Sequence, residues 1–164
     1  NLIRKRNEVD FAFAAIDTQL KKRYDLIPNL VATVQEYARH EKELLTKVAE
    51  LRAKAVSGNL SQNEQVDLNN QLSAGIRNLM VAMEAYPELK ANENFMNLQR
   101  NLTEIESQIA AARRTYNAAV TDFNNSIQVF PANIFAGMLG FTARQLFVIP
   151  EAERQNVNVK QLFS

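Results

Sequence analysis

The residue with the clearest catalytic potential is the single histidine, His40, which Glu41 follows directly. A zinc-protease helix needs a second histidine four positions later, and Leu44 stands there. A di-iron bundle needs a Glu-x-x-His pair on each of two helices, and Tyr37 occupies the position three before His40. The chain has no cysteine, which excludes thiol nucleophiles and thiolate metal sites. We therefore predict no catalytic residue, no metal and no cofactor.

A second set of polar residues interrupts or flanks the apolar stripes of the predicted helices. One interpretation is a polar network that fixes the register of the packed helices. The other is a ligand or partner pocket built around Glu41, Arg113 and Tyr116, which requires an open cavity lined by Glu41 or Glu106. The full set comprises Glu41, Arg52, Glu106, Arg113, Tyr116 and Asn117.

Four amphipathic segments must position these residues, because apolar side chains recur at spacings of three and four. The segment 25–28 predicts a tight corner between the first two helices, with a kinked continuous helix as the alternative. Ser61 and Glu64 match a capping box at the start of the third. The apolar seam from Phe95 to Phe130 is the most regular. The predicted helices span about 2–24, 26–56, 61–86 and 92–130.

Short connections between such helices predict one all-α domain over residues 1–164, an antiparallel up-and-down four-helix bundle with long helices. The tail, residues 131–164, is densely apolar where it begins, so we expect it to pack as an extension on one end of the bundle. The alternative is that the tail contacts a membrane or a partner. The residues available for such a contact are Phe135, Met138, Leu139, Phe141 and Phe147.

Charge narrows the classes of partner. The net charge is +1 with both signs interspersed, which is not the basic stripe of a nucleic-acid binder. No segment approaches the roughly 20 apolar residues that span a bilayer. The chain begins at Asn1 and continues with the basic run 4–6, which suits the cytoplasmic flank of a removed transmembrane anchor. A solvated helix face beside a truncation point is the alternative.

The sequence resembles the LemA family, and the match covers nearly the whole chain. The resemblance implies a bacterial protein with a short N-terminal segment, one transmembrane helix and an all-α domain like this one. It implies no established activity, cofactor or catalytic residue. The matching residues are the runs 23–31, 40–41 and 86–92, then Phe95, Leu98, Gln99, Leu102, Glu106, Arg113, Tyr116 and Asn117, and finally the pairs 130–131 and 140–141.

These observations favour a membrane-tethered scaffold or protein-interaction domain of the bacterial envelope, not an enzyme. Its expected partner is a protein of the membrane or envelope, and the expected tether is a single N-terminal helix outside this chain. The basic run favours the cytoplasmic side. The alternative function is a ligand-binding or enzymatic domain with a carboxylate–arginine site inside the bundle. Self-assembly through the heptad-like helix faces is a third option.

Overall fold

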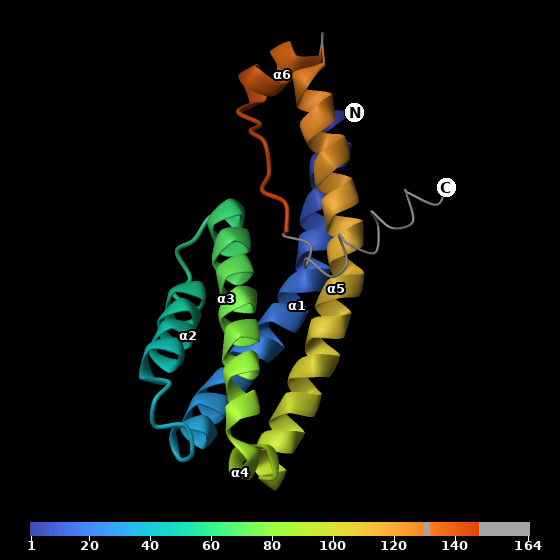
Figure 1. The fold of residues 1–164 in the computed structure, drawn as a ribbon. Helices are drawn as coiled ribbons and strands as arrows, with labels where there is room; N and C mark the ends of the chain where they lie inside the picture. Colours follow the sequence, from blue (N-terminus) through green and yellow to red (C-terminus); the bar gives the residue numbers. More distant parts are fainter. Residues whose placement is uncertain (130–131, 148–164) are drawn as a thin grey trace, which may run out of the picture.

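The chain folds into helices that alternate in direction (Figure 1). A computed structural model describes residues 1–129 and 132–147. The all-α class is confirmed, and the alternation of the four long helices is compatible with the predicted up-and-down bundle. The elements are α1 (Leu2–Gln35), α2 (Lys42–Ala55), α3 (Gln62–Ala82), the 3-10 helix η1 (Met83–Ala85), α4 (Pro87–Lys90), α5 (Glu93–Gln128) and α6 (Ala132–Leu139).

The four longer helices pack as two pairs rather than as a symmetric four-helix bundle. The long helices α1 and α5 pack along each other, and α2 and α3 form a second, shorter hairpin (Figure 1). Their buried apolar residues make two clusters. One joins the end of α1 to the start of α5 around Leu30, Leu79 and Phe95, and the other fills the remainder around Ile16, Leu72 and Phe123. Burial of these apolar side chains is the main force that holds the pairs together.

The predicted corner at residues 25–28 is wrong, because α1 continues through Pro28 to Gln35 and the chain turns at 36–41 instead. The predicted helix 26–56 is therefore split between the end of α1 and α2. Proline has no N–H, so the carbonyl of Tyr24, four residues earlier, loses its helical partner. The Arg52 side chain of α2 replaces it, donating from Nε to the Tyr24 carbonyl oxygen at 2.8 Å. A tertiary contact thus satisfies the gap that proline leaves.

This replacement predicts coupling between Pro28 and Arg52. Arg52→Met should lower the free energy of unfolding by about 1–2 kcal/mol, because it leaves the Tyr24 carbonyl unpaired. In a Pro28→Ala background the new N–H bonds that carbonyl, so the same change should cost less than about half as much. Urea unfolding of the four variants measures the cycle. Equal costs in both backgrounds would contradict the replacement.

The remaining helix ends follow local rules. Ser61 caps α3 with the predicted capping box, in which Glu64 N donates to Ser61 Oγ at 3.1 Å. Asn92 caps α5 by accepting from Phe95 N at 3.0 Å. The third helix is shorter than predicted, because the α-helix stops at Ala82 and a 3-10 turn leads to Tyr86. The predicted end of the fourth helix, residue 130, lies outside the described residues.

After α5 the chain doubles back. Helix α6 lies at the end of the molecule that holds residue 1, and residues 140–147, here called the return segment, run back along the bundle (Figure 1). Gly140 makes the reversal with a φ of 73°, a left-handed conformation that suits glycine. The predicted tail thus begins on one end, and part of it, 148–164, lies outside the described residues. Within 1–129 and 132–147 no helix combines the length and apolarity needed to cross a membrane.

Candidate functional site

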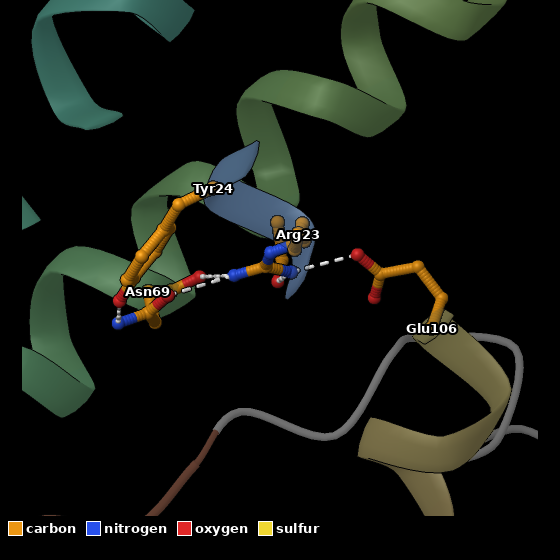
Figure 2. A network of polar contacts seen from close by, with 5 residues as sticks. Arg23, Tyr24, Asn69 and Glu106 are labelled. Carbon is orange, nitrogen blue, oxygen red and sulfur yellow. Dashed lines mark hydrogen bonds and ion pairs between the residues drawn. The ribbon is translucent and has the colours of Figure 1, made fainter. Parts of the chain in front are cut away.

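A fully buried arginine, Arg23 of α1, is the hub of a polar network with residues of α3 and α5 (Figure 2). Its Nη1 donates to Ser73 Oγ at 2.6 Å and to Glu106 Oε1 at 2.7 Å. Its Nη2 donates to Asn69 Oδ1 at 2.9 Å, and Asn69 in turn donates to the Tyr24 hydroxyl at 2.7 Å. The planar guanidinium fork suits such a junction, because it presents several donors in fixed directions. One side chain therefore links α1, α3 and α5.

The Arg23 centre opens on one side into a cleft of about 490 Å³ between α3 and α5. Glu106 and Ser73, both partners of Arg23, belong to the lining of this cleft. The Glu106 side chain is 37% exposed, so its carboxylate faces both the buried cation and the cleft. Arg77 and Arg113 also line the cleft, and Arg113 is mostly buried. This wall could hold an anionic or polar small molecule beside a fixed ion pair.

The structure distributes the six sequence-predicted site residues over separate contacts. Glu106 joins Arg23, and Arg52 bonds the Tyr24 carbonyl. Glu41 accepts a bond of 3.3 Å from the Tyr86 hydroxyl beside α4. Burial and the nearby Glu41 carboxylate raise the pKa of Tyr86.

The proposed grouping of Glu41 with Arg113 and Tyr116 is therefore not assembled. Tyr116 stands 23 residues beyond the start of α5, about 35 Å along the helix from the α4 end where Glu41 contacts Tyr86. Arg113 lines the α3–α5 cleft. Tyr116 and Asn117 instead bond the return segment, through Gln145 and Phe147. Of the predicted set, Glu106 and Arg113 share the lining of that cleft.

Sequence reasoning missed the central residue, Arg23, although a signal was present. Leu20, Arg23 and Ile27 recur at spacings of three and four, so Arg23 occupies an apolar-stripe position of α1. A charged residue at such a position is buried only with partners. Asn69 and Ser73, its partners on α3, had no comparable signal. Their importance follows only from the approach of α3 to α1.

Tyr116 forms a second buried polar position, under the return segment. Its ring is fully buried against Phe147, with ring centroids 5.3 Å apart, and its hydroxyl donates to the Gln145 carbonyl at 3.3 Å. Burial raises the pKa of Tyr116 to about 12, from an ordinary value of 10. Asp10 also raises the pKa, whereas Arg144 lowers it.

This shift predicts alkaline destabilisation. A phenol whose pKa is higher in the folded state keeps its full contribution below pH 10 and loses it as the pH rises from 10 towards 12. The free energy of unfolding should therefore fall over that interval. Tyr116→Phe should flatten the fall, at a cost of about 1 kcal/mol at neutral pH for the lost hydrogen bond. Urea unfolding from pH 8 to 11.5 measures both, with the exposed Phe11→Tyr as a matched control. If the free energy of unfolding of Tyr116→Phe fell with pH as steeply as that of the wild type, Tyr116 would not be the cause of the alkaline destabilisation.

Comparison with known proteins places this architecture. The profile of the LemA family matches residues 12–161. The chain belongs to the LemA family. It is 28% identical over 161 residues to Protein LemA of Metamycoplasma hominis, which covers 98% of this chain and 74% of that protein. The resemblance expected from the sequence is thereby confirmed.

Two further relatives share a shorter region. Magnetosome protein MamQ 2 of Paramagnetospirillum magneticum is 32% identical over 85 residues, 52% of this LemA-family chain and 31% of that protein. Magnetosome protein MamQ of Magnetospirillum gryphiswaldense is 26% identical over the same length. Each alignment covers 52% of this chain and 31% of the magnetosome protein.

Proposed function

We propose that this LemA-family chain is the protein-interaction domain of a membrane-tethered envelope protein, with the cytoplasmic side favoured by the basic run 4–6. The observation that carries the proposal is an apolar end of the molecule. Met138 is 78% exposed, and Ile134, Phe135 and Leu139 on the same helix are more than half exposed. Isolated exposed apolar residues are ordinary, whereas a contiguous group marks an interaction surface. The apolar end comprises Ile3, Val129, Ile134, Phe135, Met138 and Leu139.

The apolar end contains a groove that fits a partner helix. It has a volume of about 620 Å³ and lies between the first residues of α1 and the α5–α6 junction. Leu2, Ile3 and Phe135 belong to its lining. An amphipathic helix binds such a groove through its apolar face. Residue 1 lies at this same end, so a tether entering α1 would hold the groove close to the membrane (Figure 1).

The tail residues predicted for interaction are only partly available. Phe135, Met138 and Leu139 are exposed, in agreement with a contact surface. Phe141 is half-buried against Phe123, and Phe147 is buried against Tyr116. The proposed surface is therefore α6 with the adjoining end of α1, without the return segment.

Site-specific photo-crosslinking tests the proposal in the full-length protein within its native membrane. We expect a photoreactive residue at position 138 to give a discrete protein adduct that disappears when Phe135 is also changed to serine. Position 11 is the matched control, because Phe11 is 80% exposed on α1 and does not belong to the apolar end. Adducts with lipid alone would assign the apolar end to the membrane surface and reject a protein partner. The same adducts from positions 11 and 138 would also reject it.

A second candidate function is ligand binding in the α3–α5 cleft, which corresponds to the carboxylate–arginine site considered from the sequence. The specific observation is that Arg77, Glu106 and Arg113 line one open cleft. A polyanion or a carboxylate metabolite would suit the two arginines. Thermal-shift screening with Arg77→Gln as the comparison tests this candidate. Saturable stabilisation by an anionic ligand that Arg77→Gln removes would support it over the interaction function.

A further inference from the structure

The return segment is held by asparagine side chains through its main chain. On the α5 side, Asn124 accepts from Arg144 N at 2.8 Å and donates to the Arg144 carbonyl at 3.1 Å. Asn117 repeats this pattern with Phe147, at 3.0 Å and 3.1 Å. On the α3 side, Asn63 accepts from Gln145 N at 2.8 Å and donates to the Ala143 carbonyl at 3.2 Å. Each asparagine amide thus pairs with backbone N–H and C=O groups that a neighbouring β-strand would bond in a sheet.

The spacing of these asparagines matches an extended chain. Asn117 and Asn124 are seven residues apart, which is about 10.5 Å along a helix. Their partners, Arg144 and Phe147, are three residues apart, which is about 10 Å in extended backbone. On α3 the same interval separates Asn63 from Asn70, and Asn70 donates to the Leu146 carbonyl at 3.4 Å. The helices α3 and α5 therefore form two parallel rows of amides at the repeat of an extended polypeptide.

Only a few side chains of the return segment add to these main-chain contacts. Phe141 packs on Phe123, with ring centroids 5.9 Å apart, and Phe147 packs on Tyr116 at 5.3 Å. Between them, the Arg144 guanidinium bonds Gln62 and lies 3.8 Å from Asp10. The face of α3 and α5 that holds the return segment thus selects an aromatic residue, then a cation three positions later and an aromatic residue three positions after that. The intervening residues are recognised mainly through the backbone.

We propose that the α3–α5 face is a receptor for an extended polypeptide, and that in an assembly it binds residues 141–147 of a second copy of this chain. Within a single copy the return segment occupies the receptor in cis. A second copy supplies the same aromatic–cation–aromatic pattern and the same backbone groups, so exchange preserves every contact. Only the connection through α6 and Gly140 changes, and Gly140, at a φ of 73°, is where the chain reverses.

Peptide binding tests the receptor. A fluorescent peptide of residues 140–147 is titrated into the full chain, and anisotropy is recorded. The wild-type chain should bind weakly, because its own segment competes at a high effective concentration. Phe147→Ser weakens that competitor and should raise the apparent affinity at least about tenfold. Adding Asn117→Ala should lower the peptide affinity at least about tenfold. Adding Asn97→Ala, which changes an exposed asparagine of the same helix, should leave the affinity unchanged.

A backbone-modified peptide separates main-chain recognition from simple apolar adhesion. N-methylation at Gln145 deletes the N–H that Asn63 accepts and leaves every side chain intact. It should abolish binding to the Phe147→Ser chain. Binding that survives both the N-methyl group and Asn117→Ala would overturn the receptor, and so would the absence of saturable binding to Phe147→Ser.

Complementation tests the second copy as the occupant. One variant, Phe147→Ser, keeps the α3–α5 face intact and weakens the binding of the return segment. The other, Asn63→Ala with Asn117→Ala, keeps the return segment intact and removes two of the asparagines that bind it on the α3–α5 face. Mixing them should give a one-to-one heterodimer in mass photometry that neither variant forms alone. Peptide binding without a heterodimer would overturn the second copy as occupant, and failure of both would overturn the whole proposal.

Discussion

Replacing Arg23 by alanine is expected to lower the free energy of unfolding by about 3 kcal/mol, the lower end of the range for breaking a buried ion pair. The loss leaves Asn69 and Ser73 without their donor inside the molecule. It does not reach the upper end, because the Glu106 side chain is 37% exposed and can regain water. Urea unfolding monitored by circular dichroism measures the change.

Matched variants separate the charge of Arg23 from its bulk. Arg114→Ala removes an exposed arginine from α5 and should cost less than about 0.5 kcal/mol. Arg23→Lys keeps the charge but places its three donors on one compact ammonium instead of a planar fork, so it should recover only part of the loss. If Arg23→Ala and Arg114→Ala were equally stable, Arg23 would not be the junction of the three helices.

The second large effect is expected at Phe123, which is 1% exposed and lies beneath the return segment. Phe123→Ala should cost about 3–5 kcal/mol, from lost burial and the cavity that remains. It should also release the return segment, because the Phe141 ring and the Arg144 guanidinium both contact the Phe123 ring. Hydrogen exchange at the amides of Arg144 and Phe147 should then accelerate more than exchange in the other apolar cluster, around Leu30, Leu79 and Phe95.

Two comparisons limit the interpretation of Phe123→Ala. Phe123→Leu keeps an apolar side chain and should lose less than half as much stability. Phe11→Ala changes a phenylalanine that is 80% exposed, so the expected change is within about 0.5 kcal/mol. A loss of stability without faster exchange at Arg144 would show that the return segment is held independently of the Phe123 ring.

The proposals on α6 and on the α3–α5 face concern different surfaces. The apolar end carries Phe135 and Leu139 near residue 1, whereas the asparagine rows lie on α3 and α5 alongside the return segment. Substitution of Met138 leaves the groove asparagines unchanged, and Asn117→Ala leaves α6 unchanged. The photo-crosslinking and peptide experiments can therefore fail independently. A positive result in both would describe a domain that joins a partner at one end and a second copy along its side.

Local rules predicted much of the secondary structure. The capping box of Ser61 and Glu64 marked the start of α3, and the seam beginning at Phe95 marked α5. Both depend on contacts within about one or two turns, so the sequence contains all of the information. Pro28 showed the limit of local reasoning. A proline in a helix leaves a carbonyl unpaired, and the donor that replaces the missing N–H here, Arg52, lies 28 residues away in the sequence.

The candidate sites depended on tertiary structure for the same reason. The sequence alone determined an all-α LemA-like domain, because helical periodicity and residue type are local properties. The stripe position of Arg23 was also a local signal, but sequence reasoning did not use it. Only the packing of α1 against α3 and α5 decided that Asn69 and Glu106 would pair with Arg23. The rows of Asn63 and Asn117 likewise acquire meaning only when the return segment lies between them. Hydrogen bonds act over about 3 Å, so their partners are set by the fold and not by distance along the chain.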